Sequence, residues 1–291
     1  MPLTLEPNSN GFIESVLSES PDIGTMPEVT VKIIDIVENP QSRMKDLHKV
    51  ISNDPALSTK ILKVVNSALY GLPTSIGNID RAIVLLGQSA VKNIAIATSM
   101  MNLFSAEDGA EGCSGKDVWR HSIGMAVATK LIYEHLNKPG ADEGFLAGLI
   151  ADIGFLIERQ ARPAEVAAAI TQFKRDGGEF IAIERELIGA DHQQFGWAVS
   201  KKWRFPDSVC TAIGWHHSPA SITASDPTLA LAVRAADVLT CRLQLGFCMM
   251  FEDEPIGLEV TQRLGLTEPM IQKILKEMPK QVATAEAIFE S

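Results

Sequence analysis

The sequence lacks the features that mark several classes of protein. Its 291 residues contain no apolar run long enough to span a bilayer. The opening residues, MPLTLEPNSN, have neither the basic region nor the apolar region of a secretory signal. The formal net charge of -10 at pH 7 provides no positive field of the kind that would attract nucleic acid or an anionic membrane. We therefore expect a cytoplasmic protein with no membrane and no nucleic acid among its partners.

Cysteine is also scarce. The chain has four cysteines, and none of them forms a CxxC pair. The closest two, Cys241 and Cys248, fall on one expected helix, where they would lie too far apart to form a disulfide. We expect all four thiols to be reduced.

Strand-like alternation of apolar and polar residues is absent, and so are internal repeats and low-complexity tracts. Hydrophobic residues make up 46% of the chain, which is enough for a sizeable core. Apolar residues recur at helical spacing, with start signals such as Asp54-Pro55 and stop signals such as Gly71. The pattern predicts an all-α protein.

A small, acidic and glycine-rich stretch at Ser105 to Gly115 is the best candidate boundary in the chain. We expect two helical bundles that pack against each other, one on each side of it. The expected parts are a flexible arm at 1–10, an N-terminal helical subdomain at 11–110, a second helical subdomain at 111–250, and a C-terminal helical extension at 251–291.

One carboxylate, Asp152, interrupts the apolar run ADEGFLAGLIADIG, which we expect to lie on a helix over 141–160. A buried and unpaired carboxylate would be costly or would take up a proton, so a cation, a metal or hydrogen-bond donors should lie beside it. The candidate neighbours on other expected helices are His121, His192, His216, His217 and Asp237.

Imidazoles combined with one or two carboxylates suit zinc, manganese or iron better than calcium or magnesium, which prefer oxygen ligands. Simpler explanations exist for single residues. A histidine at the end of a helix, such as His216, is favoured by the helix dipole, and Asp237 could pair with Arg234. A metal site and a structural polar network both fit the spacing.

The chain contains, in this order, the motifs VWRH, GLIADIG, DHQQFGWAVSKKW, FPDSVCTAIGWHHSP and AADVL. Their order resembles that of the HD superfamily of metal-dependent phosphohydrolases, including its cyclic-di-GMP phosphodiesterase branch. In the first half, TMPEV, SNDPALSTKILKVVNSALYG and IDRAIVLLGQSAVKNIAIA resemble the HDOD family, the HD-related output domain of bacterial signalling proteins. The resemblance covers about residues 20–245.

The resemblance implies a set of metal ligands and two departures from it. Ala151 stands where the HD doublet has its histidine, and Phe155 stands where the phosphodiesterase branch has a lysine. A two-metal hydrolytic centre would lack both parts, whereas one set of ligands for a single metal is complete. That set is Asp152, His192, His216 and His217, and the further implied candidates are His121, Asp237 and Asp117.

The resemblance implies a bacterial signal-transduction module that binds a signalling protein, or a small ligand in the groove between its two halves. One divalent ion of iron, manganese or zinc could have a structural or sensory role in it. The alternative is a metal-dependent phosphohydrolase acting on cyclic di-GMP or another nucleotide. A third reading treats every polar residue of the cluster as core hydrogen bonding. The missing histidine and lysine favour binding over catalysis.

Overall fold

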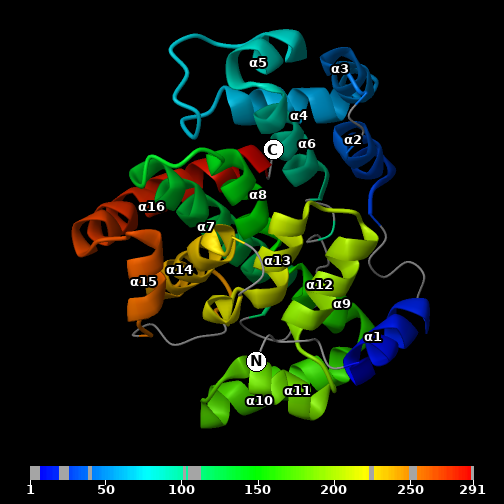
Figure 1. The fold of residues 1–291 in the computed structure, drawn as a ribbon, viewed down its shortest axis with the longest axis vertical. Coiled ribbons are helices and arrows are strands. Elements are labelled where there is room, and N and C mark those ends of the chain that lie inside the picture. Colours follow the sequence, from blue (N-terminus) through cyan, green and yellow to red (C-terminus); the bar gives the residue numbers. More distant parts are fainter. Residues whose placement is uncertain are drawn as a thin grey trace.

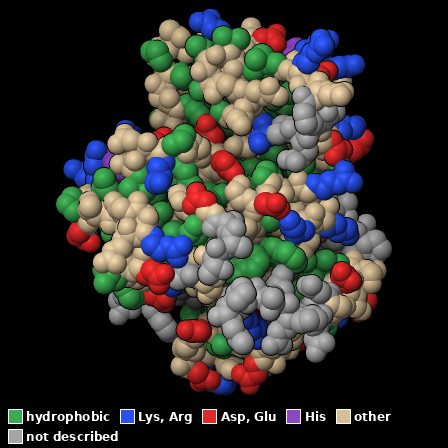
Figure 2. Space-filling model, in the orientation of Figure 1, with side chains coloured by type: hydrophobic (Ala, Val, Ile, Leu, Met, Phe, Trp, Pro, Cys, Tyr) green, Lys and Arg blue, Asp and Glu red, His purple; other side chains and the backbone are tan. Residues whose placement is uncertain are grey.

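The computed structural model describes residues 7–19, 26–38, 41–100, 103, 113–222, 226–248 and 254–289. Within these ranges the secondary structure is helical and no strand occurs, so the all-α prediction is confirmed. None of the described helices combines the length and the apolar character needed to cross a membrane. Basic and acidic side chains are interspersed over the face of the molecule shown in Figure 2.

The smaller bundle occupies the upper part of Figure 1. It consists of α2 (Glu28–Glu38), α3 (Met44–Ser52), α4 (Pro55–Val65), α5 (Ile79–Leu86) and α6 (Gln88–Met100). Asp54 caps α4 as expected, because its Oδ1 atom accepts a hydrogen bond of 2.9 Å from the backbone N–H of Leu57. The side chains of α6 are almost all buried, since α6 packs on α2 and α4 and also on α8 (Ala141–Ile150) of the larger bundle. This helix joins the two halves.

The larger bundle surrounds α8. Its other members are α7 (Gly115–His135), α9 (Ile153–Ala161), α10 (Pro163–Asp176), α11 (Phe180–Leu187), α12 (His192–Lys202), α13 (Asp207–Trp215), the short 3-10 helix η2 (Pro219–Ser221) and α14 (Thr228–Arg242). Residues 144–150 of α8 are all buried, because α7, α14, α13 and α6 enclose it. Asp152 therefore follows directly after a central helix.

The prediction of one helix over 141–160 is wrong in one respect, because the helix is interrupted between Ile150 and Ile153. Asp152 occupies the break with φ -94° and ψ 21°, and its side chain does not cap α9. The apolar spacing continues through the break and so gives no sign of it. The carboxylate instead turns toward histidines of other helices.

The first helix, α1 (Pro7–Glu19), begins within the stretch expected to be a flexible arm, of which residues 1–6 lie outside the described part. It packs on α12 of the larger bundle, although we expected it in the N-terminal bundle. Phe12 meets Phe195 edge to face with ring centroids 6.4 Å apart. The apolar side chains of α1 thus complete the core beside α12. The expected boundary at 105–115 lies mostly outside the described residues.

The C-terminal extension consists of α15 (Leu258–Leu264) and α16 (Glu268–Phe289). Helix α16 contains Pro279 in its interior and is continuous through it. Proline removes one backbone hydrogen bond from a helix interior. Packing of α16 on α7 and α4 buries Met278 and Val282 on either side of the proline, and this burial holds the helix together.

Candidate metal centre

Close packing of α9 on α12 brings Asp152 and His192 together. A Cβ atom on Gly154 would lie 1.8 Å from the carbonyl oxygen of His192 and 2.5 Å from the backbone nitrogen of Gly196. Only glycine permits so close an approach of the two backbones. Because His192 is the first residue of α12, it meets the break that holds Asp152.

The start of α12 is fixed by a capping box. Asp191 accepts a 2.9 Å hydrogen bond from the backbone of Gln194, and the side chain of Gln194 accepts one of 3.0 Å from the backbone of Asp191. Arg185 of α11 binds the same aspartate through Nε at 2.7 Å. These contacts hold His192 in the first turn, where its Nδ1 atom lies 2.7 Å from Oε2 of Glu184.

His216 and His217 come from the end of α13. Nδ1 of His216 donates to the carbonyl of Ile213 at 2.9 Å. The backbone N–H of His217 donates to Oε1 of Gln193 at 2.9 Å, which ties the end of α13 to α12. Both rings consequently face the start of α12.

The structure brings four of the predicted ligands to one place. Oδ1 of Asp152 lies 3.3 Å from Nε2 of His216 and 3.7 Å from Nε2 of His192. Nε2 of His192 lies 3.0 Å from Nε2 of His217. One ligand atom from each of these four residues lies within 4.8 Å of the others. The side chains are buried, except that of His217, which is partly buried.

The donor atoms of this group fit a divalent metal. His216 uses Nδ1–H on a carbonyl, so a neutral His216 ring presents the lone pair of Nε2 to the carboxylate of Asp152. That buried Nε2 has no hydrogen-bond donor among the described residues. Nε2 of His192 is likewise left as an acceptor, because Nδ1 donates to Glu184. A cation between these electron-rich atoms satisfies all of them, and nitrogen and oxygen donors suit zinc, manganese or iron.

Protons stabilise the same atoms when no metal is bound. Burial lowers the pKa of His192, but the charge and hydrogen bond of Glu184, together with the charges of Asp152 and Asp191, outweigh burial and raise the pKa to about 9. Burial raises the pKa of Asp152, but the nearby rings of His121 and His216 outweigh it together and hold the pKa well below its ordinary value. Burial and the neighbouring rings of His216 and His192 keep the pKa of His217 well below its ordinary value.

Arg234 controls the state of His217. A guanidinium only donates, so its Nη1, 3.3 Å from Nδ1 of His217, makes that nitrogen the acceptor. The proton of a neutral His217 then sits on Nε2 and points at His192. Arg234 also binds Asp237 at 3.7 Å, as the pairing alternative predicts, and Glu254 at 2.6 Å. His217 becomes a metal ligand through Nε2 only when its proton leaves that atom.

His121 and Asp237 join the cluster, and Asp117 does not. Nε2 of His121 lies 3.4 Å from Oδ2 of Asp152 and 3.3 Å from Oδ1 of Asp237. Burial lowers the pKa of His121, but these two carboxylates outweigh it and raise the pKa well above its ordinary value. The carboxylate of Asp117 accepts hydrogen bonds of 2.9 and 2.7 Å from the backbone and hydroxyl of Ser114. Asp117 therefore belongs to the capping box at the start of α7.

The two departures from the HD pattern are part of the core. Ala151 and Phe155 are both 0% exposed. The ring of Phe155 stacks on Phe247 at 5.2 Å with an interplanar angle of 22° and meets Phe180 edge to face at 6.1 Å. Apolar packing fills the places where the HD pattern has an imidazole and an ammonium group.

A pair of buried carboxyl groups was missed by the sequence interpretation. Glu184 and Glu158 are fully buried, and the charge of Glu184 acts on Glu158, whose two carboxyl oxygens have no hydrogen-bond partner among the described residues. Burial and the charge of Glu184 raise the pKa of Glu158 well above its ordinary value, which favours its protonated form. The available signal was the position of Glu184 in the apolar stripe of α11 between Ile183 and Leu187.

The prediction that Cys241 and Cys248 lie on one helix is wrong. Helix α14 ends at Arg242, and the chain then turns back, so Cys248 is not on the same helix as Cys241. Both thiols are free, and their sulfur atoms and one ring nitrogen of His121 lie within 4.8 Å of one another. The neighbouring thiol of Cys241 and the ring of His121 lower the pKa of Cys248 to about 6.

A small cavity reaches the cluster from the side of His217 and Arg234. Its volume is about 120 Å³. Pockets for drug-sized ligands usually have volumes of roughly 300–1,000 Å³, so this cavity admits water and small ions but no nucleotide. The other residues that line it are Gly178, Glu179, Phe180, Ile181, Ser218 and Glu254.

The two helical bundles and the buried histidine–carboxylate cluster define an HD-related helical protein. The family model of the HDOD domain matches residues 23–219, and the chain belongs to this family. An uncharacterized protein of Treponema pallidum (strain Nichols) is 22% identical over 224 residues, which are 74% of this chain and 42% of that protein. The chain thus spans less than half the length of this curated relative.

Solved structures share the fold. An HDOD domain protein of unknown function from Geobacter sulfurreducens superposes with a TM-score of 0.79 at 21% identity, over 96% of this chain and 97% of that one. A proposed signal transduction protein from Marinobacter aquaeolei VT8 gives 0.76 at 21%, over 97% and 65%. A proposed phosphohydrolase from Shewanella amazonensis SB2B gives 0.70 at 23%, over 92% and 98%. These identities support the likeness of the fold alone.

Proposed function

We propose that this protein is a bacterial signal-transduction output module that acts by binding, and that it holds one divalent ion of iron, manganese or zinc on the Asp152 set. The Asp152 set denotes Asp152, His192, His216 and His217. The observation that carries the proposal is the complete burial of Ala151 and Phe155 at the two positions that the hydrolytic centre needs. Membership of the HDOD family supports the signalling role, and the convergence of His192, His216 and His217 on Asp152 supports the single metal ion.

A hydrolytic role is disfavoured by chemistry and by space. An HD hydrolase activates a water on its metals and stabilises the developing phosphate charge with metals and cations. Ala151 offers no ligand and Phe155 no charge. The cavity of about 120 Å³ beside His217 is also too small for a nucleotide. A single buried metal that orders α9, α12 and α13 is consistent with a structural or sensory role.

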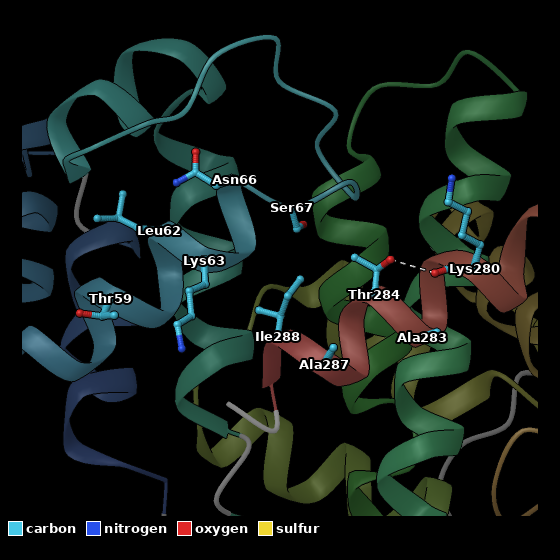
Figure 3. Close-up of a pocket in the computed structure, with 10 residues that line it drawn as sticks. All are labelled: Thr59, Leu62, Lys63, Asn66, Ser67, Lys280, Ala283, Thr284, Ala287 and Ile288. Atoms are coloured by element: carbon cyan, nitrogen blue, oxygen red, sulfur yellow. Dashed lines mark hydrogen bonds between the residues drawn. The ribbon is translucent and has the colours of Figure 1, made fainter.

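A groove between α4 and α16, and not the groove expected between the two halves, is the proposed site for a signalling partner or a small ligand. Its volume is about 940 Å³, and Figure 3 shows side chains of the two helices facing each other across it. Leu62 and Ile288 contribute apolar side chains to its lining, and Lys63 and Lys280 contribute one basic side chain from each helix. The groove joins the N-terminal bundle to the C-terminal extension, so an occupant would couple the two.

The metal part of the proposal is tested with Mn²⁺, which prefers nitrogen and oxygen ligands to thiolates. Titration of the metal-free protein, followed by electron paramagnetic resonance, should show one bound equivalent. His216→Ala and Asp152→Asn should abolish that binding, whereas His135→Ala, outside the Asp152 set, should not. Absence of Mn²⁺, Fe²⁺ and Zn²⁺ binding to these residues would leave a structural polar network as the explanation.

The binding part is tested by filling the groove. Ala283→Trp on α16 should abolish binding of a captured signalling partner or ligand, and Ala168→Trp on the exposed face of α10 is the matched control. Equal binding by both variants would place the interaction elsewhere.

The second candidate function, phosphohydrolysis, predicts turnover of cyclic di-GMP or another nucleotide by the metal-loaded protein. Such turnover, absent in His216→Ala, would overturn the non-catalytic proposal.

A further inference from the structure

Two thiols and an imidazole converge at the end of α14. Sγ of Cys248 lies 3.9 Å from Nδ1 of His121, and Sγ of Cys241 belongs to the same group of atoms within 4.8 Å of one another. In a tetrahedral zinc site with ordinary bond lengths, neighbouring sulfur and nitrogen ligands lie about 3.6–3.8 Å apart. The distance between Cys248 and His121 needs only a small contraction to match that geometry, and the distances to Cys241 need a contraction of at most about 1 Å.

The turn that carries Cys248 is anchored on two other helices. Gly246 has φ 77°, and a Cβ atom there would lie 2.1 Å from the carbonyl oxygen of Asp117. The next residue, Phe247, donates its backbone N–H to that same carbonyl at 3.1 Å and stacks on Phe155. Contacts with α7 and α9 therefore place Cys248 beside His121. Phe155, which stands in place of a lysine, is one of the anchors.

Hydrogen bonding through Nε2 of His121 leaves Nδ1 free to bind a metal. Nε2 of His121 faces Oδ1 of Asp237 at 3.3 Å and Oδ2 of Asp152 at 3.4 Å, so it serves as the donor to both carboxylates. A ligating histidine usually donates its second N–H to a carboxylate in this way. His121 then connects two neighbouring sites through Asp152, because Oδ1 of Asp152 faces His216 of the Asp152 set.

We propose that His121, Cys241 and Cys248 form a second metal site, distinct from the Asp152 set, that takes zinc or another thiophilic divalent cation. The site supplies two sulfur ligands and one nitrogen ligand and leaves a fourth position for water or an added ligand. Cys241 and His121 are buried, while Cys248 is partly exposed and gives the ion a route of entry. Each thiol releases its proton when the metal binds. This proposal does not depend on the proposed function.

Cobalt(II) is the probe that reads out sulfur ligation directly. The metal-free, reduced protein is titrated with Co²⁺, and a thiolate-to-cobalt charge-transfer band in the near ultraviolet is expected to rise and saturate. Added Zn²⁺ should displace the cobalt and remove the band. His216→Ala, which damages the Asp152 set, should retain the band, so failure of one site is distinguishable from failure of the other.

Cysteine variants decide the assignment. Cys241→Ser and Cys248→Ser should each lose the band, and Cys113→Ser and Cys210→Ser, which replace the other two free cysteines, should keep it. Circular dichroism establishes that each variant is folded. The proposal is overturned by a folded and reduced protein that gives no band, by a band that survives in the Cys241→Ser/Cys248→Ser double variant, or by a Cys241–Cys248 disulfide that persists under reductant.

Discussion

Oε2 of Glu184 lies 2.7 Å from Nδ1 of His192, and both side chains are completely shielded from solvent. The same carboxylate oxygen also lies 3.3 Å from the backbone nitrogen of His192. A carboxylate in this position fixes the tautomer and orientation of a ligating histidine and makes its free nitrogen more basic. Glu184 would therefore act on a metal in the Asp152 set through His192, without being a ligand itself.

Glu184→Gln should weaken Mn²⁺ binding to the Asp152 set by roughly 10–100-fold, the usual effect of removing such a partner. The amide can still accept a hydrogen bond from Nδ1, but it supplies no negative charge. Competition with a chelator of known affinity gives the dissociation constant. Glu186→Gln, at an exposed position of the same helix, is the matched control and should bind like the parent protein. An unchanged constant for Glu184→Gln would show that Glu184 only fills space.

Glu158→Gln should stabilise the protein, and the gain should increase with pH. The folded protein holds the pKa of Glu158 well above its ordinary value of 4.5, because burial and Glu184 disfavour its charge. Between the two pKa values the folded state binds a proton that the unfolded state has lost, so stability falls as pH rises from about 4.5. Glutamine removes this linkage and can donate to Glu184.

The measurement is the free energy of unfolding from denaturant titrations at several pH values. The difference between Glu158→Gln and the parent should be smallest near pH 4.5 and should grow above it. Glu165→Gln, on the neighbouring helix α10, serves as the comparison and should follow the parent at every pH. A constant difference across the range would mean that Glu158 is ionised in the folded protein.

Arg234→Gln should strengthen metal binding to the Asp152 set. The guanidinium fixes the proton of His217 on the nitrogen that faces His192, and its positive charge repels an incoming cation. Charges a few ångströms apart in a partly buried site interact by ~1–4 kcal/mol, so the dissociation constant for Mn²⁺ should fall by at least several-fold. Arg175→Gln, fully exposed on α10, should leave the constant unchanged. Weaker binding in Arg234→Gln would instead show that Arg234 supports the site.

Much of the architecture was predictable from local signals, because helical spacing and caps such as Asp54 are properties of neighbouring residues. The order of motifs also predicted that Asp152, His192 and His216 would meet. The break at Asp152 was not predictable, since the apolar spacing runs through it without interruption. It depends on how α9 packs against α12, which no local pattern records.

The cysteine cluster shows the same limit. Cys241 and Cys248 fall at helical spacing, yet the helix ends between them because the turn at Gly246 is held by Asp117 and Phe155, more than eighty residues earlier in the chain. The sequence alone identified Phe155 only as the residue that stands in place of a lysine. Only the structure relates that residue to Cys248.

Gly154→Ala should both destabilise the protein and weaken metal binding. A methyl group there would overlap the carbonyl oxygen of His192, which belongs to the backbone and cannot move aside by a change of rotamer. Overpacking of a core typically costs ~1–3 kcal/mol, and relief requires α9 to move away from α12. That movement separates Asp152 from His192, so Mn²⁺ affinity should fall along with the free energy of unfolding. Gly11→Ala is the matched control, because nothing lies within 4 Å of its added methyl group and alanine favours the helix by ~0.5–1 kcal/mol. Unchanged affinity in a folded Gly154→Ala protein would show that the Asp152 set does not depend on this contact.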